Sequence, residues 1–279
     1  MSAGPRYLLA EGIIREMEVR YERSDAVAVI TLDRPQARNA VTIALFDGLA
    51  EAVAQAHDDG ARALVLTGAG GYFCAGLDIK QLQSSAGNEA TVLGAVLEAG
   101  KRAVLAIAQS PLPSVSAVEG GALGGGLALA LCTDVCLAGA GARLSTQYAR
   151  VGTTTDLGLS HTLTRRLGPG RSASQLLRSP TLDAGQALAL GLIDEIVADG
   201  GALDAALGVA ADLATRSPTL VAGMRELAGT ALGHTFAEHL DAEQAWIHRG
   251  WADPTAQAYA AAFAKRTADP GSWSSTSGL

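Results

Sequence analysis

The sequence predicts a layered α/β fold, and three observations support this prediction. Apolar, strand-like runs at residues 63–67, 114–118 and 134–138 are separated by segments with helical spacing. This order of strand, loop and helix is typical of a sheet covered by helices. Hydrophobic residues make up 48% of the 279 residues and aromatic residues 4%, which indicates one large domain with an aliphatic core.

The first predicted elements are a β-hairpin and a helix. Polar and apolar residues alternate over residues 17–21 and 26–32, and Ser24-Asp25 between them suits a turn. Thr42 is a suitable N-cap for the helix that follows, and Gly60 ends that helix. The hairpin therefore leads directly into the first covering helix.

The alternation continues through the middle of the chain. A helix is predicted over residues 89–109, between the strands at 63–67 and 114–118, and a short helix begins at about Gly124, before the strand at 134–138. From about Gly158 onward strand signals fade. Helical windows then dominate, at residues 202–215, 217–232, 235–249 and 254–266.

These boundaries predict four parts of the chain. Residues 1–15 form a flexible N-terminal extension, 16–200 the core, 201–267 a C-terminal helical region and 268–279 a disordered tail.

Composition excludes several classes of function. A net charge of −7 disfavours nonspecific nucleic-acid binding, which requires clustered cations. The three cysteines, Cys74, Cys132 and Cys136, show no metal-ligand spacing, so we expect reduced thiols in a cytoplasmic protein without a metal site. The first twenty residues lack the long apolar core of a secretory signal, and Asp134 interrupts the apolar stretch at 120–142. We therefore expect no membrane span.

Two glycine-bearing stretches, residues 73–80 and 120–126, carry the functional signal. Each follows a strand-like run, and glycine allows the backbone to approach a ligand closely. Each stretch can direct one backbone N–H toward a common point, which would make an oxyanion hole. Either stretch alone would fit a tight turn without a ligand. A dinucleotide site is disfavoured because Phe73 stands where the third glycine of that fingerprint belongs.

Together with residues 30–40 (ITLDRPQARNA), these stretches resemble the enoyl-CoA hydratase/isomerase (crotonase) superfamily. The similarity runs from about residue 19 to residue 266. It implies a crotonase (ClpP/crotonase-like) spiral of ββα turns, with terminal helices that pack across subunits in a homotrimer or a dimer of trimers. It also implies an acyl-CoA substrate. No cofactor is bound tightly in this picture, because coenzyme A arrives as part of the thioester.

The resemblance also implies which residues form the site. The N–H groups of Leu77 and Gly125 would stabilise the enolate oxygen. Arg34, Arg38 and Lys80 would meet the CoA phosphates, with Lys265 contributing from the last helix, although a solvated basic face is an alternative for these cations. The expected substrate- and CoA-binding residues are Arg34, Ala37, Arg38, Ala75, Leu77, Asp78, Ile79, Lys80, Gly124, Gly125 and Lys265.

The group that moves the proton departs from the hydratase pattern. Hydratases of this family hold water with two glutamates, and the corresponding positions here are Ala128 and Tyr148. Asp156 falls where some isomerase branches carry a catalytic aspartate. The favoured reaction is therefore double-bond isomerisation of an enoyl-CoA, with Asp156 as proton shuttle. Tyr148 would donate a hydrogen bond or close the pocket.

Alternatives to this interpretation stay open. Asp156 could cap the helical segment that follows at residues 162–167. The protein could be an enoyl-CoA hydratase that recruits another acid. It could also be a noncatalytic acyl-CoA binding protein that keeps the oxyanion hole but lacks the base.

Overall fold

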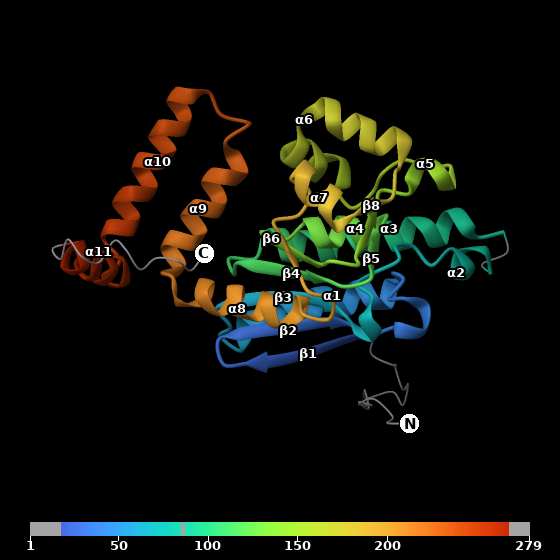
Figure 1. The fold of residues 1–279 in the computed structure, drawn as a ribbon, viewed down its shortest axis with the longest axis horizontal. Coiled ribbons are helices and arrows are strands. Elements are labelled where there is room, and N and C mark those ends of the chain that lie inside the picture. The colour runs from blue at the N-terminus through green and yellow to red at the C-terminus, as the bar shows by residue number, and fades with distance from the viewer. Residues whose placement is uncertain (1–17, 85–86, 268–279) are drawn as a thin grey trace. The chain divides into compact units, whose positions relative to one another are not determined.

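The computed structural model describes residues 18–84 and 87–267 (Figure 1). The predicted extension at 1–15 and the predicted tail at 268–279 lie outside the described residues. The chain divides into two compact units, Met1–Ala214 and Thr215–Leu279. The predicted division at residue 200, and the role of residues 201–267 in trimerisation, stay predictions.

The first unit is built on a six-stranded sheet. β1 (Val19–Ser24) and β2 (Val27–Leu32) form the predicted hairpin, and β2 continues in parallel with β3 (Ala63–Gly68) and β4 (Ser114–Val118). The strand order is β1-β2-β3-β4-β6-β9, where β6 spans Val135–Gly139 and β9 spans Glu195–Val197. β2, β3 and β4 are buried over almost their whole length, which explains why they read as nearly continuous apolar runs.

A second, three-stranded sheet contains β5 (Gly121–Leu123), β7 (Arg143–Ser145) and β8 (Leu182–Asp183). Helices dominate beyond Gly158, as expected, but two short strands, β8 and β9, also lie there. These strands have two and three residues, which is too short to show a period of two.

Helices cover both faces of the large sheet. On one face, α1 (Ile43–Asp58), α3 (Glu89–Ala108) and α4 (Gly125–Leu131) contribute to the main core. On the other face, α8 (Ala202–Thr215) packs a stripe of alanines against residues of β2, β3, β4 and β6. The Thr42 side chain accepts a hydrogen bond from Leu45 N at 3.0 Å, which confirms the predicted cap of α1.

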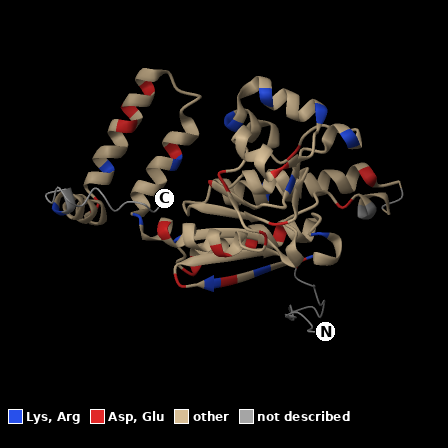
Figure 2. Ribbon diagram, viewed as in Figure 1, with Lys and Arg blue, Asp and Glu red and all other residues tan. Residues whose placement is uncertain are grey.

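Shorter or more distant elements complete this unit: η1 (Pro35–Ala37), η2 (Ala69–Gly71), α2 (Ile79–Gln83), α5 (Tyr148–Val151), α6 (Leu159–Arg178) and α7 (Ala184–Leu190). α6 carries four arginines, and Figure 2 colours basic positions along its ribbon blue.

The second unit contains α9 (Pro218–Thr230), α10 (Phe236–Trp251) and α11 (Pro254–Thr267). α9 packs on α10, and Gly223 leaves room for the Trp246 ring, because a Cβ at that glycine would lie 2.8 Å from Trp246 Cε3. Thr235 and Glu238 form a capping box at the start of α10. Among the described residues of the whole chain, no helix has the length and apolarity needed to cross a membrane.

Candidate active site

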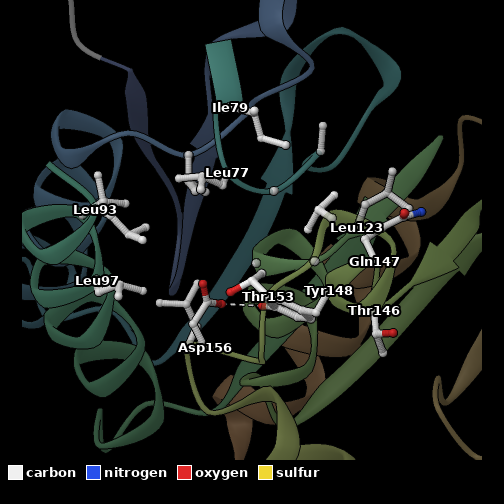
Figure 3. Close-up of a pocket in the computed structure, with 18 of the residues that line it drawn as sticks. Leu77, Ile79, Leu93, Leu97, Leu123, Thr146, Gln147, Tyr148, Thr153 and Asp156 are labelled. Atoms are coloured by element: carbon white, nitrogen blue, oxygen red, sulfur yellow. Dashed lines mark hydrogen bonds between the residues drawn. The ribbon is translucent and has the colours of Figure 1, made fainter. Parts of the chain in front are cut away.

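A cavity of about 310 Å³ lies in the first unit, among α1, α3 and the start of α4 (Figure 3). Its walls are mainly apolar, and Phe46 of α1 and Leu93, Val96 and Leu97 of α3 supply one side. Polar groups come from the segment around α5. The polar lining residues are Thr146, Gln147, Tyr148, Thr153 and Asp156.

Hydrogen bonds join the two glycine-bearing stretches beside this cavity. Cys74 N donates to Gly121 O at 3.1 Å, and Leu123 N donates to Cys74 O at 3.0 Å. The approach is so close that a Cβ at Gly126 would lie 2.3 Å from Cys74 O. Glycine is therefore required at residue 126 for α4 to begin next to the Cys74 segment.

This contact brings the two predicted N–H donors to the same cavity. Leu77 and Gly125 both line it. A Cβ at Gly76, whose φ is +86°, would lie 3.4 Å from Gly125 N, so the two loops touch at this point. Gly125 is the first residue of α4, and its N–H consequently has no acceptor within the helix. Among the hydrogen bonds of the described residues, neither N–H donates to the protein.

Asp156 and Tyr148 form the second part of the site. The Tyr148 hydroxyl donates a hydrogen bond to Asp156 Oδ1, as the dashed line in Figure 3 shows. Burial raises the pKa of the Asp156 carboxyl, and the hydrogen bond from Tyr148 opposes this rise because it favours the charged form. Burial also raises the pKa of Tyr148, and the negative charge of Asp156 adds to that effect. Tyr148 therefore stays a protonated donor.

Sharp backbone turns place this pair. Gln147 has a φ of +62° just before α5, and Gly152 has a φ of +77° at its end. Leu157 follows Asp156 with a φ of +49°. These left-handed residues fold the segment back on itself, so that Asp156 meets the tyrosine eight positions earlier.

The alternative that Asp156 caps the following helix was wrong. α6 begins at Leu159, its N-cap residue is Gly158, and no side chain caps it. The Asp156 carboxyl instead accepts from Tyr148 and lines the cavity. The two hydratase positions also differ in placement: Ala128 is buried inside α4 and is not a lining residue, whereas Tyr148 is one.

The cavity gathers seven of the expected site residues: Ala75, Leu77, Ile79, Gly124, Gly125, Tyr148 and Asp156. Arg34, Ala37, Arg38 and Asp78 lie outside its lining. Lys265 is an exposed residue of α11 in the second unit. The backbone of Lys80 belongs to α2, and its side chain is outside the described ones.

The arginines make specific contacts within the fold. Arg34 Nε lies 3.0 Å from Glu18 Oε1, and Arg34 Nη2 lies 3.2 Å from Asp78 Oδ2. Its Nη1 donates to Ala40 O at 2.5 Å. The Arg38 guanidinium lies over the Tyr72 ring, 5.5 Å from the centroid. These contacts show how the loop is held, and the role of the two arginines in CoA binding stays a prediction.

Sequence reasoning missed several lining residues. Gln147 and Thr153 carry polar groups, but neither belongs to a recognisable motif. Leu157 also lines the cavity, and nothing in the sequence pattern singles it out. A leucine at positive φ leaves no signal in sequence, since glycine is the residue expected there.

Comparisons with known proteins agree with this geometry. The sequence pattern of the family described as Enoyl-CoA hydratase/isomerase matches residues 22–268. A relative from Rhodobacter capsulatus, named "Probable enoyl-CoA hydratase", is 39% identical over 181 residues, which is 65% of this chain and 69% of that protein. A "Crotonyl-CoA hydratase" from Syntrophomonas wolfei is 33% identical over 178 residues, 63% of this chain and 67% of its own.

Solved structures show the same fold. The crystal structure of a putative enoyl-CoA hydratase/isomerase from Mycobacterium abscessus has a TM-score of 0.84 at 31% identity, covering 88% of this chain and 96% of its own. A putative enoyl-CoA hydratase from Streptomyces coelicolor A3(2) has a TM-score of 0.82 at 28% identity, covering 93% and 96%. The predicted α/β crotonase fold with C-terminal helices is thus confirmed, and the chain belongs to the enoyl-CoA hydratase/isomerase (crotonase) family of acyl-CoA enzymes.

Proposed function

We propose that this protein isomerises a 3-enoyl-CoA to the conjugated 2-enoyl-CoA, with Asp156 as the proton shuttle. The observation that carries this proposal is the cavity's content: one half-buried carboxyl with a raised pKa, beside two N–H groups that have no acceptor among the described residues. Asp156 is the only acid among the described lining residues. A single base that can both take and return a proton is sufficient for moving a double bond.

The N–H donors, the carboxylate and the tyrosine have separate roles in the proposed reaction. The N–H groups of Leu77 and Gly125 bind the thioester oxygen and stabilise the charge that it gains when a proton leaves C2. The Asp156 carboxylate takes that proton and returns it to C4 of the resulting dienolate, so no atom is added or lost. Each N–H donor of this kind contributes roughly 2.7–4 kcal/mol to transition-state stabilisation. The Tyr148 hydroxyl orients the carboxylate through Oδ1.

Hydration is the second candidate function, and the names of two relatives favour it. The proteins from R. capsulatus and S. wolfei are both named as hydratases. In that case Asp156 and Tyr148 would have to hold and activate a water together, since Ala128 provides no second acid. A noncatalytic acyl-CoA binding protein would keep the N–H pair and turn over neither substrate.

One experiment separates these functions. The purified protein is given 3-hexenoyl-CoA and crotonyl-CoA in parallel, and products are followed by the absorbance of the conjugated thioester and by mass. We expect conjugated product from 3-hexenoyl-CoA without the mass of an added water. Conversion of crotonyl-CoA to a product heavier by one water, with no isomerisation of 3-hexenoyl-CoA, would establish the hydratase instead.

The Asp156→Asn variant tests the shuttle itself. Asparagine keeps the shape and an acceptor for Tyr148 but cannot take a proton. We expect turnover to fall by at least about 100-fold, while binding of the CoA ester, measured by calorimetry, persists. Unchanged turnover in this variant would exclude Asp156 as the base.

A further inference from the structure

The residue after the proposed base, Leu157, is packed against two glycines from different helices. Its Cδ2 lies so close to Gly100 of α3 that a Cβ there would stand only 2.4 Å away. Its Cδ1 would lie 3.1 Å from a Cβ at Gly125, the residue that supplies an oxyanion N–H. Leu157 thus contacts the wall helix and the oxyanion donor at once.

Leu157 and Gly100 are both residue types that their own backbone conformation disfavours. Leu157 has a φ of +49°, a conformation that a leucine side chain disfavours. Gly100 stands in the interior of the 20-residue helix α3, where glycine weakens the helix relative to alanine. Phe46 of α1 closes the same site, because a Cβ at Gly100 would lie 3.0 Å from its Cε2. Local costs that coincide beside an active site are typical of residues held there for function.

We propose that Leu157 is a positioning residue for the reaction: wedged between Gly100 and Gly125, it fixes Asp156 relative to the oxyanion hole. This inference rests on the proposed function of Asp156 as proton shuttle. Leu157 acts by holding the 156–158 turn, so that the carboxyl faces the cavity and Tyr148. Gly100 supplies the space that the leucine side chain occupies. The base and the N–H donor are thereby kept at a constant separation, which proton transfer from a bound thioester requires.

A Cβ added to Gly100 tests this arrangement. In Gly100→Ala the new methyl group must displace Leu157 Cδ2, and the turn that carries Asp156 moves with it. We expect kcat for 3-hexenoyl-CoA to fall roughly 10- to 100-fold, with a smaller change in KM, because the change lies at Leu157 and not at the residues expected to meet the CoA phosphates. Thermal unfolding should shift little, since alanine strengthens the helix and so offsets the crowding.

Gly94→Ala is the matched control. Gly94 belongs to the same helix, is exposed, and would have no heavy atom within 4 Å of its Cβ. This substitution brings the same gain in helix propensity without contact with Leu157, and we expect kcat to equal that of the original protein.

Two further readouts separate positioning from a general loss of structure. In a Leu157→Ala background the clash with Leu157 is removed and only the milder contact with Phe46 remains, so adding Gly100→Ala should cost little further activity, and the two effects should be non-additive. In Gly100→Ala alone, water reaches the displaced carboxyl, and the acid limb of the kcat/KM profile should move to lower pH. Tyr148 faces Asp156, and the Cys74 thiol lies near Tyr148, so both are kept unchanged in every variant.

The results of these experiments distinguish a failure of the positioning role of Leu157 from a failure of the proposed function. Equal kcat in Gly100→Ala and Gly94→Ala, or additive losses with Leu157→Ala, would overturn the positioning role. If Asp156→Asn loses turnover in the same assay while Gly100→Ala does not, only this inference fails. If Asp156→Asn retains full turnover, the proposed function itself fails.

Discussion

Burial and hydrogen bonding have opposite effects on the pKa of the Asp156 carboxyl. Removing the hydrogen bond from Tyr148 should therefore shift the pH dependence of activity. Burial raises the pKa of Asp156, and the Tyr148 hydrogen bond lowers it. In Tyr148→Phe the burial effect is opposed only by a backbone hydrogen bond, so the pKa of Asp156 should rise further. The acid limb of kcat/KM should then move to higher pH, with the largest loss of activity under acidic conditions. A pH–rate profile that stays in place would show that Tyr148 does not act on Asp156.

The same raised pKa predicts how Asp156 affects stability. The folded protein binds the Asp156 proton more tightly than the unfolded chain, where the pKa is about 3.9. The stabilising contribution is therefore complete below that value and is lost as pH rises through the raised folded-state pKa. At neutral pH the half-buried carboxylate destabilises the fold, and Asp156→Asn should unfold at a higher temperature than the original protein.

Thermal unfolding at pH 7 and at pH 3.5, below about 3.9, measures this difference. We expect the gain from Asp156→Asn to shrink at the lower pH, where both proteins carry a neutral group at this position. Asp241→Asn on the exposed surface of α10 is the control and should show no such gain. A gain that is equal at both pH values would contradict the linkage.

At the scale of elements, the start of α4 carries one of the two N–H donors of the proposed oxyanion hole. A Cβ at Gly126 would lie 2.3 Å from Cys74 O, so Gly126→Ala must push α4 away from the strand-like segment that leads to Leu77. If one N–H donor leaves the hole, turnover should fall about 100- to 1,000-fold. The measurement is kcat on 3-hexenoyl-CoA together with the free energy of unfolding.

Gly208→Ala in α8 is the control for Gly126→Ala. Its added Cβ would have no heavy atom within 4 Å, and alanine there should stabilise the helix by up to about 1 kcal/mol. Equal activity in both variants would show that the close approach at Gly126 is not needed for catalysis.

Elements with strong internal patterns could be predicted from sequence, and contacts between distant segments could not. β4 was placed correctly at residues 114–118 because a buried parallel strand is apolar on both faces. β8 has two residues and owes its existence to pairing with β7. The contact of Tyr148 with Asp156 depends on left-handed turns at non-glycine residues, which sequence does not reveal.

The arginines illustrate the same limit. Arg34 was expected at the CoA phosphates because its motif suggested it. The fold brings it to Asp78, 44 residues away, and to Glu18 in the segment before β1. An ion pair between segments so far apart depends on the tertiary structure, so no local spacing could indicate it. The glycine-bearing stretches were more informative, since their role lies in backbone approach, which glycine itself marks.

At the scale of the whole molecule, α10 carries an apolar stripe that the described residues of its own unit do not cover. Phe236, Leu240, Ile247 and Trp251 are 81%, 48%, 66% and 66% exposed. They are separated by four, seven and four residues and so lie on one face of the helix. A helix with this much exposed apolar surface is expected to pack against another chain.

The predicted homotrimer or dimer of trimers supplies such a partner. Sedimentation should then give a mass three or six times the 28.3 kDa of the chain. Leu240→Asp combined with Ile247→Asp places charges on the stripe and should lower the mass toward that of a monomer. Ala245→Asp, at an exposed position on the opposite face of α10, should leave the mass unchanged. A monomeric original protein would contradict the prediction.

The dissociated variant also tests where the CoA cations come from. The described cavity, with Asp156, Tyr148 and both N–H donors, is formed within the first unit, so the chemical step should survive dissociation. If Lys265 reaches the CoA of a neighbouring subunit, losing the assembly should raise KM for the CoA ester more than it lowers kcat. Lys265→Ala in the intact assembly should reproduce that rise in KM. An unchanged KM in both proteins would place the phosphate contacts within a single chain.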